Sequence, residues 1–276
     1  MQQYWEEKYD GTKIRRPELA RYRLDWSIKM IGQTSILAPK KEIQKVVDKR
    51  TEGNPQRQRR LVAALNAMRG WFGMKKPDMI NREPKPQNNF KYHTKEQFDK
   101  ALSFVESTDK VSARTYRSLF NILFSSGART GEAFAFKGHM RNKEKLKIHT
   151  QIDRYGKEVP TKNSKRHTTI LFEEAISDFD YWISAPDKKF MVRGSLVRIW
   201  KKACKKAFPD NPELWITVHD LRHSYAVRML TVYQQRIEVI AKLLGDTAAV
   251  CEEYYLGFEQ SDELLDHVLK NIRSTN

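Results

Sequence analysis

The sequence has few of the features that mark secreted, metal-binding or membrane proteins. Its 276 residues include only two cysteines, Cys204 and Cys251, and no CxxC pair, which excludes a disulfide scaffold, a zinc ribbon and a thioredoxin-type dithiol. No apolar run approaches the roughly 18 residues of a membrane-spanning helix. The first ten residues also lack the basic and then apolar order of a signal peptide. We therefore expect a soluble protein of a reducing, cytoplasmic compartment.

Acidic residues are scarce relative to basic ones. The chain carries 51 Lys and Arg against 34 Asp and Glu, a formal net charge of +17, which favours a polyanionic partner. Nucleic acid is a better match than a membrane surface, because the sequence shows no isolated basic amphipathic helix and no lipidation signal. A nucleoid-associated location in the cytoplasm is therefore expected. Hydrophobic residues make up 39% of the chain, enough to form folded domains rather than a disordered chain.

A break in composition divides the chain. Residues 80–93 contain prolines, asparagines and charges without apolar periodicity, which predicts an interdomain linker. Residues 1–88 carry 20 basic and 10 acidic side chains, so +10 of the net charge falls in under a third of the chain. We expect this N-terminal part to be a DNA-binding domain, followed by a second domain over residues 94–276.

Residues 56–72 predict a basic amphipathic helix in the first domain, with an apolar stripe of Leu61, Leu65, Met68 and Phe72. Arginines fall mostly off that stripe, and clustered arginines suit contact with phosphates. The expected DNA contacts are Arg57, Arg59, Arg60 and Arg69. A solvated basic face without DNA is the alternative interpretation.

The second domain is predicted to be mainly helical with one small sheet. Thr94 and Gln97 form a capping box at a helix start, and a helix over about 111–126 ends at Gly127. Residues 145–172 alternate apolar and polar side chains between turn residues, which predicts a three-stranded antiparallel meander. Helical patterns resume from about residue 173. The fold class predicted from these elements is mainly α with a small antiparallel β meander (α+β).

The segment at 217–230 carries the most informative cluster of charged side chains. Thr217 and Asp220 form a second capping box, and Val218, Leu221, Tyr225 and Met229 form a buried stripe. His219 and Arg222 stand three residues apart on a helix's first turn, where the helix dipole favours a phosphate. A surface pair without function is the alternative.

Further groups suited to phosphate chemistry occur elsewhere in the chain. Arg129 follows Gly127 in a turn, with Glu132 three residues later, and Lys162 lies near a predicted hairpin tip. Taken singly, Arg129 and Lys162 fit solvated side chains equally well. Downstream, Tyr254 and Tyr255 follow Asp246 on a helix. A tyrosine attacks phosphorus when cations stabilise its phenolate and the pentacoordinate phosphorane, and two arginines, a histidine and a lysine supply such cations without a metal.

These motifs together resemble the tyrosine recombinase (phage integrase) family over most of the chain. The family's HxxR box stands here as HDLRHSYA, its arginine box as GARTGE, its hairpin lysine phrase as TKNSKRHTTIL and its LGH phrase as LLGD. The family's lysine maps to Lys162, with Lys165 as the weaker alternative. The usual nine residues from Asp246 reach Tyr255, and Tyr254 is the runner-up.

The resemblance implies a helical core-binding domain and a catalytic domain that form a C-shaped clamp on duplex DNA. It implies cofactor-free phosphoryl transfer, in which Tyr255 forms a 3′-phosphotyrosyl link and strand exchange reverses the step. Arg129 and Arg222 would hold the nonbridging oxygens. His219 would act as general base and hydrogen-bond donor, and Lys162 as general acid. Glu132 would orient these groups, although it fits an acidic residue of a helix's first turn equally well. The resemblance further implies that a terminal helix over 261–274 docks on a neighbouring protomer of a tetramer, with accessory DNA-bending proteins as further partners. Packing of this helix on its own domain is the alternative.

Asp246 departs from the family pattern, which has His or Trp at that position. An ionised carboxylate cannot donate to a phosphate, so Asp246 either caps the helix that begins at Thr247 and faces away, or weakens or regulates the site. A catalytically impaired DNA-binding regulator is therefore an alternative function. A telomere resolvase or a topoisomerase-like enzyme shares the residue set. A metallohydrolase built on His149, His167, His219 and His223 is disfavoured, because no HxH or HExxH spacing exists.

Overall fold

The computed structural model describes residue 6 and residues 17–75, 78–83, 90–161 and 166–259. The chain divides into two compact units, residues 1–88 and 89–276. Both ends of the linker predicted at 80–93 belong to these units, because Ile80 lies in the core of the first and His93 is buried in the second. Within the described residues, no helix has both the length and the apolar character needed to cross a membrane.

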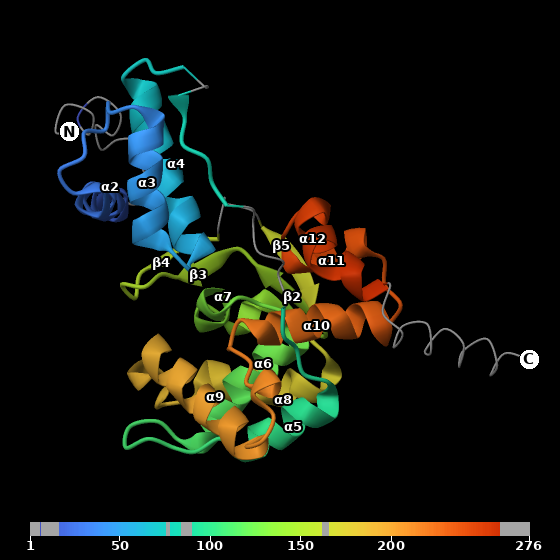
Figure 1. The fold of residues 1–276 in the computed structure, drawn as a ribbon. Coiled ribbons are helices and arrows are strands. Elements are labelled where there is room, and N and C mark those ends of the chain that lie inside the picture. The colour runs from blue at the N-terminus through green and yellow to red at the C-terminus, as the bar shows by residue number, and fades with distance from the viewer. Residues whose placement is uncertain (1–5, 7–16, 76–77, 84–89, 162–165, 260–276) are drawn as a thin grey trace, which may run out of the picture. The chain divides into compact units, whose positions relative to one another are not determined.

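In the part of the first unit that the structure describes, α-helices pack around one apolar core (Figure 1). Its helices are α2 (Pro17–Ile31), α3 (Lys40–Thr51) and α4 (Pro55–Trp71). Asn54 caps α4 by accepting a hydrogen bond from the Arg57 N–H, and Pro55 occupies the first helical position. The predicted basic helix is therefore present as α4. Its stripe of Leu61, Leu65 and Met68 is fully buried, whereas Phe72 follows the helix and is exposed.

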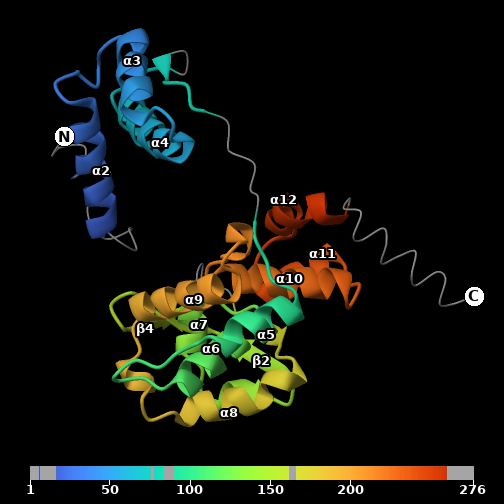
Figure 2. The same cartoon turned by 60° about the horizontal axis from the view of Figure 1, so that its bottom comes forward.

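The second unit is built around α6, with most of its helices and two small sheets surrounding it (Figures 1 and 2). Its α-helices are α5 (Lys95–Ser103), α6 (Ala113–Ser126), α7 (Thr130–Phe134), α8 (Ile176–Ser184), α9 (Arg193–Ala207), α10 (Asp220–Thr231), α11 (Ile237–Leu244) and α12 (Ala248–Glu259). Short 3-10 turns are η2 (Gly138–Met140), η4 (Glu173–Ala175), η5 (Lys188–Phe190) and η6 (Pro212–Leu214). The prediction of a mainly helical fold is confirmed.

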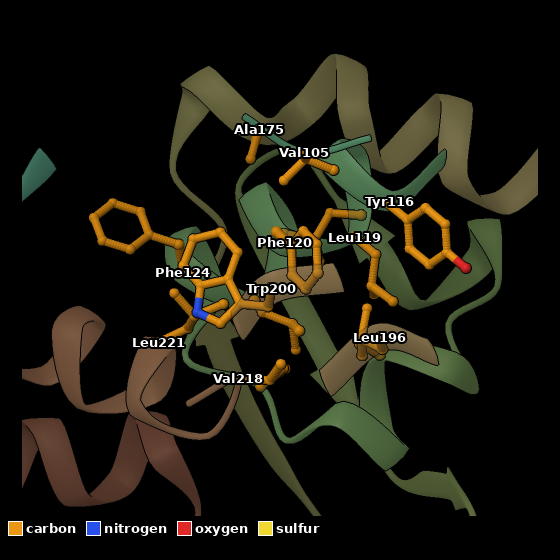
Figure 3. Packing of buried hydrophobic residues seen from close by; sticks show 14 of the residues in the cluster. Val105, Tyr116, Leu119, Phe120, Phe124, Ala175, Leu196, Trp200, Val218 and Leu221 are labelled. Carbon is orange, nitrogen blue, oxygen red and sulfur yellow. The ribbon is translucent and has the colours of Figure 1, made fainter. Parts of the chain in front are cut away.

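The main core lies between α6 and the helices that pack on it. Figure 3 shows Phe120 and Phe124 of α6 facing Trp200 of α9, and the Phe120 and Trp200 ring centroids are 4.7 Å apart. All three side chains are at most 1% exposed. Burial of such large aromatic surfaces fixes α6 rigidly, and the turn that follows α6 carries the first site residue.

Local signals at two helix ends occur as predicted. Thr94 and Gln97 form both reciprocal bonds of a capping box at the start of α5. Gly127 ends α6 in the left-handed conformation with φ +65°. A side chain there would also overlap Tyr225 and Leu244, so glycine is required at this close approach of α6, α10 and α11.

The predicted three-stranded meander over 145–172 is wrong in its strand order. Strands β2 (Lys145–Ile148), β3 (Thr150–Ile152), β4 (Glu158–Pro160) and β5 (His167–Ile170) are all antiparallel, but they fall into two sheets. One sheet has the order β1-β2-β5, with β1 at Arg141–Asn142, and the other is the β3-β4 hairpin. Leu146 of β2 and Thr169 of β5 are paired and both buried. Burial of this shared face places β5 beside β2 rather than beside β4.

The helices α10, α11 and α12 form a second core next to the sheet. Figures 1 and 2 both show α11 and α12 side by side, with α10 next to α11. The cluster includes Tyr225, Ile240, Leu244, Cys251 and Tyr255. The end of α11 at Gly245 and the start of α12 thereby lie close to the first turn of α10.

Gly245→Ala is expected to destabilise the second unit strongly. Gly245 has φ +64°, and an added Cβ would lie 2.5 Å from Nδ1 of His167. Backbone strain and overlap together should lower the free energy of unfolding by about 2 to 4 kcal/mol, measured by urea denaturation. Gly156→Ala is the matched control, because Gly156 has φ +81° but open space around it. Equal losses for the two variants would contradict the close contact with His167.

Candidate active site

Arg222 is buried at the centre of the candidate site, with 4% of its surface exposed. Its guanidinium donates hydrogen bonds to the carbonyls of Gly127 at 2.8 Å and Leu244 at 2.6 Å. These carbonyls stand at the C-terminal ends of α6 and α11, where helix carbonyls lack partners within the helix and carry partial negative charge. The two helix ends thereby fix the guanidinium in one orientation.

Arg129 lies in the turn between α6 and α7 and is held by Glu132. The backbone N–H of Arg129 donates to the Glu132 carboxylate at 2.8 Å, and the guanidinium donates to the same carboxylate at 3.0 Å. Glu132 is 1% exposed, and the positive charge of Arg129 compensates the charge of this buried carboxylate. This geometry gives Glu132 the means to orient the arginine, as the sequence predicts.

Asp246 joins the two arginines. One carboxylate oxygen accepts a hydrogen bond from Arg129 at 2.7 Å, and the other accepts one from Arg222 at 2.5 Å. Of the two alternatives for Asp246, the helix cap that faces away is therefore wrong. Thr247 accepts the N–H of Val250 instead, and Asp246 turns toward the guanidiniums because two buried or half-buried cations attract its charge. The two arginines therefore converge on a single anionic group.

His219 lies beside these groups, just before α10. Thr217 and Asp220 form the predicted reciprocal bonds around it, and Val218, Leu221, Tyr225 and Met229 are all buried as predicted. Removal from water, followed by the positive charge of Arg222, lowers the pKa of His219. The His219 imidazole is thus partly desolvated, yet the residue keeps exposed surface whereas Arg222 is buried.

Tyr255 of α12 is buried, and its phenolic oxygen lies 2.8 Å from Nδ1 of His223. It is 3% exposed, and burial raises the pKa of its hydroxyl above the usual range. The phenol of Tyr255 is therefore neutral at pH 7. Tyr254 is half-buried, and its ring centroid lies 5.2 Å from that of His223.

Two histidines of this region have roles that the sequence did not predict. His223 contacts the predicted nucleophile, and its spacing of four residues from His219 was the available signal, since such residues share a helix face. His167 of β5 packs against Gly245, and burial lowers its pKa. No local motif indicates the His167 contact, because it depends on the pairing of β5 with β2.

Some predicted site residues lie outside the described residues. Lys162, its alternative Lys165 and the predicted terminal helix over 261–274 belong to this group. Among the residues that the structure describes, no three His, Cys, Asp or Glu side chains are grouped to hold a metal ion.

The first unit presents basic side chains along α4. Arg57 and Arg60 are exposed and line a groove between α2 and α4 together with Arg23. Arg59 is half-buried, and its guanidinium donates to the carbonyl of Glu83. These three arginines of α4 remain candidates for DNA contact.

The prediction that Arg69 contacts DNA is wrong, because Arg69 is 0% exposed. Its guanidinium donates to the carbonyls of Ile36, Ala38 and Asp78 at 2.7 to 3.2 Å. The side chain therefore ties the loop before α3 and the segment after α4 to the helix. Helical spacing placed Arg69 next to the apolar stripe, and these carbonyls provide the partners that a buried cation needs.

Arg69→Met and Arg60→Gln are expected to distinguish the structural role of Arg69 from the DNA contact of Arg60. Arg69→Met removes the donors to three carbonyls around a buried side chain and should cost about 3 kcal/mol in unfolding free energy, measured with urea. Arg60→Gln should leave the stability of the protein unchanged. It should reduce the slope of log DNA affinity against log salt by about 0.9, the value for one phosphate contact. An unchanged salt slope in Arg60→Gln would exclude Arg60 from the DNA contacts.

Solved structures with this fold are DNA integrases and recombinases. The lambda integrase dimer bound to a core site is 18% identical, with a TM-score of 0.67, over 92% of this chain and 93% of that one. The Tn1549 transposon integrase, in complex with transposon right-end DNA, is 17% identical with a TM-score of 0.66, over 92% and 93% of the two chains. The XerH site-specific recombinase bound to its difH substrate is 13% identical with a TM-score of 0.60, over 86% and 75%.

No protein-family model and no curated protein matches this sequence. The structural likeness nevertheless spans nearly the whole chain, including both compact units. The protein therefore has the fold of the tyrosine recombinases, as the sequence motifs predicted.

Proposed function

We propose that this protein is a site-specific tyrosine recombinase, an integrase of a mobile element that cuts and rejoins duplex DNA. The observation that carries the proposal is the convergence of Arg129 and Arg222 on one anionic group. Their guanidiniums come from separate helices, and the protein holds both in place through Glu132 and two helix C-termini. Such a pair of forked, permanently charged donors suits the two nonbridging oxygens of a phosphodiester.

The reaction is an exchange of phosphodiester bonds. Tyr255 attacks the scissile phosphorus, the bond to the 5′ oxygen breaks, and a 3′-phosphotyrosyl link forms. Arg129 and Arg222 stabilise the charge of the phosphorane, and His219 assists with proton transfer and hydrogen bonding. Lys162 protonates the departing 5′ oxygen. The 5′ hydroxyl of a second duplex then reverses the step, so no ATP, cofactor or metal ion is required.

The partners follow from the same proposal. The basic side chains of α4, Arg57, Arg59 and Arg60, bind the phosphates of the duplex. A tetramer on two DNA sites, coupled by the terminal helix over 261–274, carries out strand exchange with accessory DNA-bending proteins, in the cytoplasm at the nucleoid. The integrases with this fold that were solved with transposon end DNA or bound to a core site support this choice of partner.

Covalent trapping on nicked duplex DNA tests the proposal. The recognition site is first found by sequencing the genomic fragments that the protein binds. A duplex carrying that site is then nicked beside the scissile phosphate, so that the short fragment diffuses away after cleavage and religation stops. The expected result is a protein–DNA band on a denaturing gel with the DNA joined through its 3′ end. A link through the 5′ end would contradict the mechanism.

A second function is favoured by the contact of Asp246 with both arginines. A protein whose phosphate-binding guanidiniums are already occupied by its own carboxylate could bind the site without cutting it, as a DNA-binding regulator. Tight binding to the verified site without any covalent adduct would support this function over recombination.

A further inference from the structure

The second histidine of the HDLRHSYA segment is in direct contact with the predicted nucleophile. Nδ1 of His223 lies 2.8 Å from the phenolic oxygen of Tyr255, a normal distance for a strong hydrogen bond. His219, which the family resemblance implies as general base, lies one helical turn earlier, and the two ring centroids are 5.5 Å apart. The group nearest to the reacting phenol is thus His223.

We propose that His223 is the residue that holds the Tyr255 phenol for attack and accepts its proton. This inference rests on the proposed recombinase function and deepens it. As the phenolic oxygen bonds to phosphorus, its proton passes to Nδ1 of His223 and the P–O5′ bond breaks. The 5′ oxygen takes a separate proton from Lys162. Each bond that forms is matched by one that breaks, and no further reactant is needed.

The protonation state of His223 fits an acceptor. Burial, followed by the nearby His219, lowers the pKa of His223 to about 4, while Asp220 and Asp246 oppose the shift and Arg222 supports it. At neutral pH the imidazole is therefore uncharged and one of its nitrogens has a free lone pair. In the tautomer with its proton on Nε2, Nδ1 carries that lone pair, so the Tyr255 hydroxyl is the donor and Nδ1 the acceptor.

Aromatic rings limit the access of water to this hydrogen bond. The ring of Phe90 lies edge-on to Tyr255 at 5.2 Å and 5.4 Å from His223, and Tyr254 covers another side of the imidazole at 5.2 Å. Cys251 belongs to the same buried cluster as Tyr255. In such a setting hydroxide does not reach the phenol readily, and burial disfavours a free phenolate. Proton acceptance by a neighbouring base then becomes necessary for attack.

Proton transfer becomes favourable only as the reaction proceeds. A neutral imidazole of low pKa does not remove a proton from a resting phenol. When the O–P bond forms, the phenolic oxygen loses most of its proton affinity. At the same time the negative charge of the phosphorane raises the proton affinity of the adjacent His223 imidazole. His223 thus stabilises the transition state more than the resting protein.

The test compares His223→Asn and His223→Ala in the full-length protein on nicked site DNA. Asn places an amide oxygen close to the position of Nδ1, so it keeps an acceptor for the phenol but takes up no proton. Both variants should form the covalent adduct about 10² to 10⁴ times more slowly, the range for loss of a general base. His139→Asn is the control, since His139 is exposed and lies outside the site.

The dependence of the rate on pH distinguishes proton acceptance from mere positioning. Between about pH 6.5 and 9 the wild-type rate should change by less than about twofold, because His223 stays neutral. In His223→Asn the rate should rise about tenfold per pH unit, because attack then requires the phenolate. If His223→Asn formed the adduct at the wild-type rate and this rate did not change with pH, the proton-transfer role would be overturned.

A substrate with sulfur in place of the 5′ bridging oxygen separates His223 from the general acid. The thiolate leaves without protonation, so this substrate should restore cleavage by Lys162→Ala but not by His223→Asn. Rescue of both variants alike would assign His223 to the leaving group and overturn the proposal.

Nitrogen-15 NMR of the histidine rings tests the contact without any cleavage. Nδ1 of His223 should be unprotonated at pH 7 and should shift in Tyr255→Phe but not in Tyr254→Phe. A protonated Nδ1 would overturn the proposal even if the protein recombines DNA. If the NMR result is as expected but the wild-type protein forms no adduct, the proposed function is contradicted. The acceptor contact between His223 and Tyr255 would still be supported.

Discussion

Tyr255→Phe is expected to bind its DNA site with unchanged affinity and to form no covalent adduct at all. The substitution removes the phenolic oxygen but keeps the buried ring that packs against Phe90. Because the attacking atom is missing, the loss should exceed the roughly 10⁴-fold detection range of a gel assay rather than appear as a slower rate. Binding by gel shift and adduct formation on nicked duplex measure the two quantities separately.

Tyr254→Phe is the matched control for this prediction. Adjacent helical residues point about 100° apart, so only one of the two phenols meets the phosphate. Tyr254 should therefore be dispensable for the adduct. An adduct that persists in Tyr255→Phe and disappears in Tyr254→Phe would assign the nucleophile to Tyr254.

Asp246→Asn is expected to speed cleavage by about tenfold. The carboxylate accepts hydrogen bonds from Arg129 and Arg222, and these are the groups that bind the phosphate when DNA is present. Two anions at one pair of guanidiniums repel each other, so the carboxylate must give way before the phosphate is held. Asn keeps the size and one acceptor oxygen but removes the charge. The half-exposed position of Asp246 weakens the effect through solvent screening, which is why we expect tenfold rather than more.

The same substitution should have the opposite effect on the free protein. Without the carboxylate, two guanidiniums face each other with less compensation, so Asp246→Asn should melt at a lower temperature in phosphate-free buffer. Inorganic phosphate should restore more stability to this variant than to wild type, because it fills the place of the lost charge. Slower cleavage in Asp246→Asn, together with unchanged melting, would show that the carboxylate assists the reaction.

Sequence patterns predicted the site residues whose placement depends on local structure. Gly127 ends α6 in a left-handed turn, and Arg129 and Glu132 meet at the start of α7, because helix ends are encoded over three or four residues. The capping box at Thr217 and Asp220 fixes the register of Arg222 in the same way. These signals predicted which arginines would be present at the candidate site.

Contacts between distant segments could not be predicted in this way. Arg222 meets the carbonyl of Leu244 only because α10 and α11 pack together, and Asp246 turns to the arginines rather than to its own helix for the same reason. The strand order β1-β2-β5 depends on which faces are buried, and Arg69 is buried because carbonyls from two other segments surround it. Each of these outcomes is decided by tertiary packing that periodicity does not contain.

The most direct test of the account is to identify the amino acid that becomes linked to DNA. Wild-type protein is trapped on nicked site DNA, the complex is digested with a protease and a nuclease, and the peptide that carries residual nucleotide is sequenced by mass spectrometry. The account predicts a single modified peptide with the nucleotide on Tyr255, joined through a 3′ phosphate. A nucleotide on another residue, or a verified DNA site that binds tightly and yields no modified peptide, would contradict it.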